Sequence, residues 1–412
     1  MRGARGGQAS ACGAVAAGGS FGLKITSVRS VIVHAEMRNW IFVRVETDQD
    51  GLFGWGEATL EWKTRAVAGA IEDLAPLVIG RDPRDIEKLV KIMKKHSFWR
   101  LGVIGMSAIS GIEIALWDIL GKTLSVPVWR LLGGRVRDRV RVYTHLGLGD
   151  MRAVYETESA NQLTERAHDV LARGYRAMKI VIIPYTHYSA LLPQVDRTAR
   201  MMAALRDAVG PDIEIMVDFH GRPASASAAL AYIDAIEPAR PMFVEEVLPP
   251  GDSLGLREVA SKTSVPIATG ERLIDLAEFD ELFRSRAVSI AQPDICHCGG
   301  LWETKKIAAM AEAAGIGVAP HNPIGPIAGV AALHFAVSTS NHVIQEEMVG
   351  AVPWYFDVVH GPIEMVDGFW QVPTKPGLGI EVDMKECARH PFAPETPHTL
   401  NAVLNDGTIA DW

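Results

Sequence analysis

The second half of the chain carries ionisable side chains at a nearly constant spacing. Six of them follow one another in the order Asp218, Glu245, Glu271, Asp294, His321 and Glu346. Each lies in or at the C-terminal end of a short apolar run, and successive members are 27, 26, 23, 27 and 25 residues apart. That interval fits one strand–helix unit, and in a barrel of such units the C-terminal strand ends converge on one mouth. Because six unrelated buried charges would be costly, the spacing predicts a single polar site.

Three carboxylates from adjacent predicted strands form a candidate metal site. Asp218, Glu245 and Glu271 offer hard oxygen ligands, which suit Mg²⁺ and leave its other positions to water or substrate oxygens. Glu246 directly follows Glu245, so either glutamate could be the second ligand; we prefer the first. Zinc suits the site less well, because the first predicted strand supplies His145 alone instead of a pair of histidines.

The remaining polar residues could supply an acid, a base and positive charge. Asp294 and His321 end neighbouring predicted strands, and a carboxylate that holds one imidazole nitrogen raises the basicity of the other, so His321 is a candidate general base. His220 lies two residues after Asp218, on the same side of a strand, and is a candidate general acid. Two further groups complete the set: Glu346, if protonated, could donate to a developing oxyanion, and Lys179 could attract a substrate carboxylate. This set suits proton abstraction beside a carboxylate, followed by loss of a leaving group.

The elements that must position these residues are a series of short strands and amphipathic helices. The strands are predicted at 140–146, 177–183, 213–220, 242–246, 266–271, 289–294, 317–321 and 343–347. The helices between them are predicted at 158–173, 195–208, 225–236, 252–262, 275–285, 301–314 and 326–338. Eight strands with seven intervening helices indicate an α/β fold, a modified TIM barrel of the (β/α)7β type with parallel strands.

A separate α+β unit precedes the barrel. Strands are predicted at 24–34 and 40–47, with a turn at Asp50-Gly51 that makes an antiparallel meander, and helices at 64–79, 83–97 and 105–122. Residues 1–22 are rich in glycine, alanine and serine without a continuous apolar stretch, so we expect a flexible extension and not a signal peptide.

Composition narrows the class of protein. The net charge of −8, without a basic block, argues against a nucleic-acid partner. We find no apolar run close to the roughly 20 residues of a membrane helix. Two of the four cysteines, Cys296 and Cys298, lie only two residues apart, which argues against a disulfide framework and fits a reducing, cytoplasmic location. The Cys296-His297-Cys298 run lacks companion ligands for a soft metal, so we interpret it as structural.

These motifs together resemble the enolase superfamily, and within it the mandelate racemase subgroup. The resemblance covers about residues 23–385 and rests on a series of short motifs: Gly54-Trp55-Gly56-Glu57, Ala115-Leu116-Trp117-Asp118 with Gly121-Lys122, Leu131-Leu132-Gly133-Gly134, Val217-Asp218-Phe219-His220-Gly221-Arg222, Gly270-Glu271-Arg272, Ala319-Pro320-His321-Asn322-Pro323 and Ile344-Gln345-Glu346-Glu347. The barrel motifs are similar to those of acid-sugar dehydratases of the D-galactonate dehydratase type. The resemblance implies a capping domain at 23–139, a catalytic barrel at 140–350 and a C-terminal segment, 351–412, that returns to the capping domain.

The resemblance also implies an activity and a role for each residue. One Mg²⁺ per subunit would be bound by Asp218, Glu245 and Glu271, and the substrate would be a small acid sugar. His321, oriented by Asp294, would remove the C2 proton of an aldonate, and His220 would protonate the departing C3 hydroxyl to give a 2-keto-3-deoxy acid. The ene-diolate would be held by Mg²⁺, Lys179 and Glu346. Members of the family often form dimers to octamers, so we expect a homo-oligomer.

One departure from the wider subgroup bears on the reaction. Many racemising relatives carry Lys-x-Lys on the second barrel strand, whereas this chain has Lys179-Ile180-Val181, which disfavours a racemase with a Lys/His pair. Two alternatives stay open: a sugar-acid or lactone cycloisomerase or epimerase on the same scaffold, and a catalytically silent binding relative, although every ligand and base position is filled.

The residues that select the substrate are the ones that the sequence determines least. Arg222, Arg272 and Asn322 could bind the carboxylate or hydroxyls of the substrate, and the two arginines could equally form salt bridges that support the metal-binding carboxylates. Aromatic residues in the loops could form substrate walls, core or dimer contacts; they lie at Trp40, Trp62, 96–100 and 184–188. His145 and His187 have no assigned role.

Overall fold

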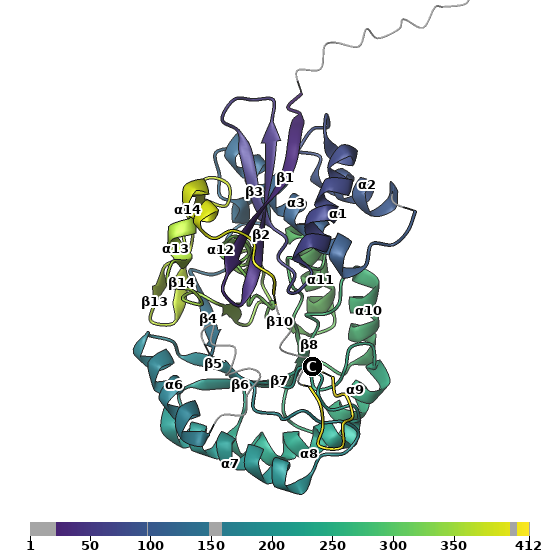
Figure 1. Cartoon of the computed structure of the whole chain (residues 1–412), viewed down its shortest axis with the longest axis vertical. Coiled ribbons are helices and arrows are strands. Elements are labelled where there is room, and N and C mark those ends of the chain that lie inside the picture. Colours follow the sequence, from purple (N-terminus) through teal and green to yellow (C-terminus); the bar gives the residue numbers. More distant parts are fainter. Residues whose placement is uncertain (1–21, 97, 148–158, 396–401, 412) are drawn as a thin grey trace, which may run out of the picture.

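The computed structural model describes residues 22–96, 98–147, 159–395 and 402–411. Its N-terminal part is a three-stranded sheet followed by helices, shown at the top of Figure 1. The elements are β1 (Ile25–Ala35), β2 (Arg38–Thr47), β3 (Phe53–Glu57), α1 (Thr64–Val78), α2 (Ile86–His96), α3 (Gly102–Thr123) and the short α4 (Val128–Leu131). Both strand pairs are antiparallel, which confirms the predicted meander. The extension predicted over residues 1–22 lies, except for Gly22, outside the described residues.

Eight parallel strands with helices around them form the rest of the core, in the middle and lower parts of Figure 1. The strands are β4 (Arg139–His145), β5 (Ala177–Ile180), β6 (Glu214–Asp218), β7 (Phe243–Glu245), β8 (Ile267–Thr269), β9 (Ile290–Ala291), β10 (Gly317–Val318) and β11 (Gln345–Glu347). The helices described between them are α6 (Ala160–Ala172), α7 (Leu192–Val209), α8 (Ala226–Ile236), α9 (Ser253–Ala260), α10 (Leu276–Ser285), α11 (Leu301–Ala313) and α12 (Pro326–Val337), with a 3₁₀ turn η1 (Glu237–Ala239) after α8.

The sheet closes on itself. Each strand from β4 to β9 pairs with the next in parallel register, and β11 pairs in parallel with β4. The remaining gap is bridged ahead of β11, where the Val343 N–H donates to the Val318 carbonyl at 2.8 Å. The predicted (β/α)7β barrel is therefore confirmed. Strands β5 to β11 are shorter than predicted, and Asp294 and His321 lie in loops three residues beyond β9 and β10.

Helix α3 corrects one expectation from the sequence. With 22 residues and a mean hydropathy of 1.6 over its most apolar window, it is long and apolar enough to cross a membrane by length and composition. Within the fold, 83% of that window is buried, where α3 packs against β3 and α1. Gly56 explains how closely β3 approaches: a side chain there would collide with the Gly111 carbonyl of α3. The apolar composition of α3 is thus accounted for by the interior of the protein.

Two buried glutamates fasten the N-terminal domain to the barrel. Glu57, at the end of β3, accepts the backbone N–H groups of Gly325 and Ala328 at the start of α12, each at 2.8 Å. Glu113, in α3, accepts the N–H groups of Leu301 and Trp302 at the start of α11, at 2.8 and 2.9 Å. Unpaired N–H groups and the helix dipole make a helix N-terminus a favourable place for a carboxylate. Both helices directly follow the loops that carry Asp294 and His321, so these contacts connect the N-terminal domain to the ends of both loops.

The C-terminal segment contacts both parts of the molecule. It contains α13 (Tyr355–Val358), β12 (Val359–His360), β13 (Met365–Val366), β14 (Phe369–Gln371), β15 (Glu381–Val382) and α14 (Met384–Arg389). Strand β14 pairs antiparallel with the first half of β4. Farther on, the His34 N–H of β1 donates to the His390 carbonyl at 2.9 Å, and the Asn39 N–H donates to the Glu395 carboxylate at 2.7 Å.

Candidate active site

The interior of the barrel is built in layers, with one side chain from each strand. The apolar layer consists of Tyr143, Ala177, Met216, Phe243, Ala268, Ile290, Ala319 and Ile344, which form one buried cluster. Side chains two positions farther along a strand point to the same face. In chain order those positions are His145, Lys179, Asp218, Glu245, Gly270, Gln292, His321 and Glu346. Four of the six periodic residues, Asp218, Glu245, His321 and Glu346, thus lie in one polar layer above an apolar one, at the C-terminal mouth of the barrel. Glu271 and Asp294 come from the loops just beyond Gly270 and Gln292.

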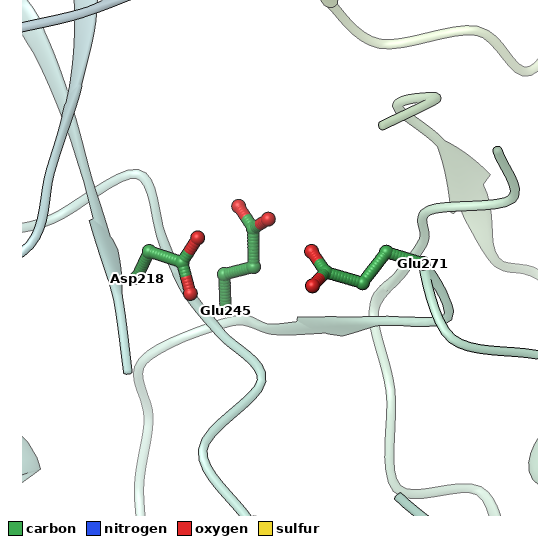
Figure 2. A group of neighbouring side chains, drawn as sticks. All are labelled: Asp218, Glu245 and Glu271. Atoms are coloured by element: carbon green, nitrogen blue, oxygen red, sulfur yellow. The ribbon is translucent and has the colours of Figure 1, made fainter. Parts of the chain in front are cut away.

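Three carboxylates from β6, β7 and the loop after β8 converge in this mouth (Figure 2). One oxygen each from Asp218, Glu245 and Glu271 lies within 4.8 Å of the others, and the described residues contain no second such group of three. Glu245 Oε2 is buried without a hydrogen-bond partner in the described part of the chain. Since an isolated buried carboxylate oxygen is costly, the arrangement could hold a metal ion. The all-oxygen donor set fits a hard divalent cation.

Lys179 ties this acidic group to the other side of the mouth. Its Nζ lies 2.8 Å from Glu245 Oε1, 3.2 Å from Asp218 Oδ2 and 2.6 Å from Glu346 Oε1. Burial by itself lowers the pKa of Lys179, but the attraction of these three carboxylates outweighs it and raises the pKa well above the ordinary value. Lys179 is therefore a fixed positive charge, and burial together with the negative charge of Asp218 raises the pKa of Glu245 well above normal.

The structure separates the adjacent glutamates of the β7 end. Glu245 faces Lys179 in the mouth, whereas Glu246 Oε2 accepts two hydrogen bonds from the Arg272 guanidinium, at 2.8 and 2.6 Å. Glu246 Oε1 accepts the Thr269 hydroxyl and the Gly270 N–H. The geometry thus brings Glu245, and not Glu246, to the acidic group. Arg272 forms a salt bridge, as one of the two interpretations from sequence expected, although its partner is Glu246 and not one of the three converging carboxylates.

His321 is held by Asp294 as the sequence predicts. Its Nδ1 lies 2.8 Å from Asp294 Oδ2, which leaves Nε2 toward the mouth, 3.5 Å from Glu271 Oε2. Burial lowers the pKa of His321, but Glu271, the hydrogen bond to Asp294 and the charge of Glu346 raise it to about 10. The Cys296 N–H donates to the other Asp294 oxygen at 2.7 Å, so the loop itself orients the carboxylate.

A second imidazole on the Asp294 carboxylate was not predicted. His297 Nε2 lies 3.5 Å from Asp294 Oδ2, and His297 Nδ1 lies 2.9 Å from the Ser107 hydroxyl of α3. The N-terminal domain therefore reaches the His321–Asp294 pair through Ser107 and His297. The neighbouring cysteines are consistent with a structural role: both are free and buried, and Cys298 Sγ lies 3.1 Å from the Thr304 hydroxyl.

His220 reaches the site by a route that differs from the prediction. Strand β6 ends at Asp218, so the two residues do not alternate along one strand. His220 has a φ of +52°, followed by Gly221 at +68°, and this left-handed turn brings the His220 ring back so that Nε2 lies 3.1 Å from Asp218 Oδ2. Non-glycine residues with positive φ are uncommon and cluster at functional sites. The His220 N–H also donates to Asp218 Oδ1 at 2.9 Å, which secures the turn.

Glu346 lies opposite the acidic group and is itself well anchored. The Asn322 N–H donates to Glu346 Oε2 at 2.8 Å, and the Asn322 amide donates to the Glu346 carbonyl at 3.2 Å. Burial raises the pKa of Glu346, but Lys179 and His321 lower it below the ordinary value. The structure therefore favours a carboxylate over the protonated donor considered from sequence, and it directs the Asn322 amide toward Glu346.

The other candidates for substrate selection differ in their surroundings. Arg222 is buried, donates to the Ile183 carbonyl and lies over the Tyr185 ring at 4.5 Å, so it braces the loop after β5. Trp40 is buried and packs edge-on against Trp354 and Tyr355, in the core. By contrast, Phe98 and Trp99 are 85% and 79% exposed.

Comparison with known proteins places this geometry in a family. Residues 25–133 match the mandelate racemase / muconate lactonizing enzyme N-terminal domain, and residues 162–386 match the enolase C-terminal domain-like family. The chain belongs to the mandelate racemase subgroup of the enolase superfamily. Its D-galactonate dehydratase relative from Xanthomonas euvesicatoria pv. vesicatoria (strain 85-10) is 38% identical over 95% of this chain and 100% of the relative. A D-galactonate dehydratase from Klebsiella pneumoniae (strain 342) is also 38% identical, over 90% of this chain and 96% of that protein.

Solved structures of this subgroup share the whole architecture. A mandelate racemase/muconate lactonizing enzyme from Jannaschia sp. CCS1 has a TM-score of 0.82 and 36% identity, covering 90% of this chain and 98% of its own. A mandelate racemase/muconate lactonizing enzyme-like protein from Roseovarius sp. TM1035 has a TM-score of 0.83 and 34% identity, with 91% and 97% covered. The two-domain arrangement is therefore common to mandelate racemase subgroup structures from different bacteria.

Proposed function

We propose that this member of the mandelate racemase subgroup is an acid-sugar dehydratase that acts on D-galactonate or a close relative. The observation that carries the proposal is the pair of histidines at the mouth. His220 follows β6 and His321 follows β10, four strands apart in a ring of eight, with the acidic group between them. Elimination of water needs a base for one proton and an acid for the leaving hydroxyl. The 38% identity to D-galactonate dehydratases over 95% of the chain supports the same reaction.

Asp218, Glu245 and Glu271 would hold one Mg²⁺ per subunit. Their all-oxygen donor set and the unpartnered Glu245 Oε2 support this assignment. When bound, Mg²⁺ supplies positive charge that stabilises a substrate carboxylate as its negative charge increases. On the protein side, Lys179 adds a fixed positive charge 2.8 Å from Glu245, so a carboxylate oxygen placed beside it would be stabilised in the same direction.

His321 would act as the general base. Its Nδ1 is engaged by Asp294, which fixes the ring. A cation held by Glu271 would offset the negative charge that raises the His321 pKa, so that a neutral ring could accept the C2 proton at Nε2. The C2–H electron pair becomes the C1–C2 double bond of an ene-diolate. The Ser107–His297 contact on the same Asp294 carboxylate would help to fix its position.

His220 would act as the general acid. It gives a proton to the C3 hydroxyl, the C3–O bond breaks, and water leaves as the ene-diolate electrons form the C2–C3 double bond. The resulting enol takes up a proton at C3 and loses the proton of its C2 hydroxyl to become a 2-keto-3-deoxy acid, so the net change is loss of one water. A cycloisomerase or epimerase on this scaffold would share the base and the metal site but would have no need of an acid at His220.

The function can be tested with purified protein, Mg²⁺ and a library of aldonic and aldaric acids. We expect a 2-keto-3-deoxy product from D-galactonate or a near relative, detected with semicarbazide. Activity should be absent in His321→Asn and in protein kept in excess chelator. Deuterium incorporation at C2 without any keto product would instead indicate an epimerase or cycloisomerase. Confirmed metal binding with neither product nor exchange would contradict the proposal for the acids tested.

A further inference from the structure

His145 is a buried polar side chain that the proposed mechanism does not use. It ends β4, is only 7% exposed, and its Nε2 has no hydrogen-bond partner within the described residues. A buried donor or acceptor without a partner costs free energy, so such atoms call for an explanation. The position of His145 in the barrel explains why its Nε2 has no partner.

His145 belongs to the polar layer of the mouth. It follows Tyr143 of the apolar layer by two positions, as Lys179 follows Ala177 and Glu346 follows Ile344. In the β4–β5 ladder it pairs directly with Lys179. The rule that brings the proposed lysine and glutamate into the mouth therefore brings this imidazole there as well.

The hydrogen bonding of His145 defines which nitrogen carries the proton. The Gly147 backbone N–H donates to His145 Nδ1 at 3.3 Å, so Nδ1 is the acceptor nitrogen of a neutral ring. The proton then resides on Nε2, which makes Nε2 a donor without an acceptor. Burial, reinforced by the positive charge of Lys179, lowers the pKa of His145 to about 3, which keeps the ring neutral at any pH where the enzyme would work.

We propose that His145 is a specificity-determining residue that donates its Nε2 proton to an oxygen of the bound acid sugar. The inference rests on the proposed function for the ligand, a polyhydroxy carboxylic acid. The proposed contact comes from β4, which lies between β5 with Lys179 and β11 with Glu346. In the ring of eight strands β4 is opposite β8, which precedes the loop that carries Glu271. A neutral donor suits this place, because the neighbouring lysine already supplies the positive charge.

The acceptor could be one of two kinds of oxygen, and both share the same chemistry. A carboxylate oxygen is present in every acid sugar, whereas a hydroxyl at C4, C5 or C6 distinguishes one sugar from another. A site built to hydrogen-bond a hydroxyl strongly rejects an analogue that lacks it, because the protein donor is then left unpaired. Deoxygenated substrates therefore separate the two kinds of oxygen.

The experiment compares two replacements of His145 in the full chain with Mg²⁺. His145→Phe keeps a ring of similar size without a donor, and His145→Gln keeps an N–H donor. His342→Phe is the matched control. His342 is also a buried histidine whose Nε2 has no partner among the described residues, but it lies four residues before Glu346, ahead of the N-terminal end of β11 and away from the mouth.

Affinity is read by calorimetry with D-galactonate in a His321→Asn background, which binds without turnover, and kcat/KM is read in the active background. We expect His145→Phe to lose about 10- to 100-fold in both, with His145→Gln within about fivefold of the parent protein. His342→Phe should change affinity by less than about threefold. Mg²⁺ titration and circular dichroism of each variant establish that it is folded and binds metal.

Each outcome decides the point. A loss that disappears for one deoxygenated D-galactonate assigns the acceptor to that hydroxyl, and a loss that persists for all of them assigns it to the carboxylate end. Unchanged binding and turnover in His145→Phe, or equal losses in His145→Phe and His342→Phe, overturn the inference while the dehydratase function stands. If the parent protein binds Mg²⁺ but neither binds nor dehydrates any acid sugar, the proposed function fails and this inference fails with it.

Discussion

Glu245 and Glu246 are adjacent in sequence but serve opposite sides of the β7 end. Glu245 Oε1 lies 2.8 Å from Lys179 Nζ inside the mouth, while Glu246 Oε2 lies 2.6 Å from the Arg272 guanidinium outside it. Glu245 is the last residue of β7, whereas Glu246 lies just beyond the strand with a left-handed φ of +45°. One carboxylate is thereby available to the acidic group and the other holds the loop that carries Glu271 and Arg272.

The two glutamates should therefore respond differently to the same substitution. Glu245→Gln removes a charge from the acidic group, so we expect Mg²⁺ affinity to fall by about 10- to 100-fold or more, with loss of activity. Glu246→Gln should retain Mg²⁺ binding but lower the free energy of unfolding by about 1–3 kcal/mol, because it breaks a charged pair with Arg272. Calorimetric Mg²⁺ titration and urea unfolding measure the two effects. The reverse pattern would transfer the ligand role to Glu246.

His220 should be needed for dehydration but not for removal of the C2 proton. In His220→Asn the base His321 and its partner Asp294 are intact, so exchange of the C2 proton with D₂O should continue. Formation of the keto product should fall by about 10²- to 10⁴-fold, the usual contribution of a general acid. Nuclear magnetic resonance follows both processes in one sample, with His321→Asn as the variant that loses both. Dehydration by His220→Asn at the parent rate would remove the acid role from this residue.

Removal of the metal should both inactivate and destabilise the protein. Asp218, Glu245 and Glu271 bring like charges together, and burial and the charge of Asp218 already raise the pKa of Glu245. A bound cation offsets this repulsion, so Mg²⁺ at 100 times its dissociation constant should add about 2.7 kcal/mol of stability. Thermal unfolding with Mg²⁺, with chelator, and with NaCl at the same ionic strength tests this. Equal melting temperatures in all three would argue against a metal at this site.

Glu113 should make stability depend on pH. Burial raises its pKa to about 8, against the opposing effect of three N–H donors from Leu301, Trp302 and the Trp117 indole. In the unfolded chain this carboxyl loses its proton near pH 4.5. Between these values the folded state binds more protons, so stability falls as pH rises, by up to a few kcal/mol between about pH 5 and 8.

Glu113→Gln removes this titration and is the natural comparison. Relative to the variant, the parent protein should lose free energy of unfolding as pH rises from 5 to 8, and the difference should level off above that range. Urea unfolding at intervals of half a pH unit measures it. Parallel curves for the two proteins would mean that the three N–H donors keep the carboxylate ionised throughout.

The sequence predicted the fold best where its pattern was periodic. Alternating apolar runs and amphipathic stretches predicted the barrel and its seven described helices, because burial on both faces leaves a repeated pattern in the chain. The strands predicted at the mouth were too long, since β9 and β10 have only two residues each. Backbone pairing ends there before the apolar run does, and the run continues as the loops that carry Asp294 and His321.

What the sequence by itself determined was the set of groups: D, E, E, D, H and E at one period, with Lys179 and His220 beside them. What only the tertiary structure decided was which atoms meet. The left-handed turn at His220, the division between Glu245 and Glu246, the His297–Ser107 contact and the place of His145 in the polar layer depend on strand register and on segments far apart in the chain. The spacing along the chain indicates which residues share a face. The contacts between domains, and the direction of a side chain beyond the end of a strand, are decided only when the barrel closes and the N-terminal domain packs on it.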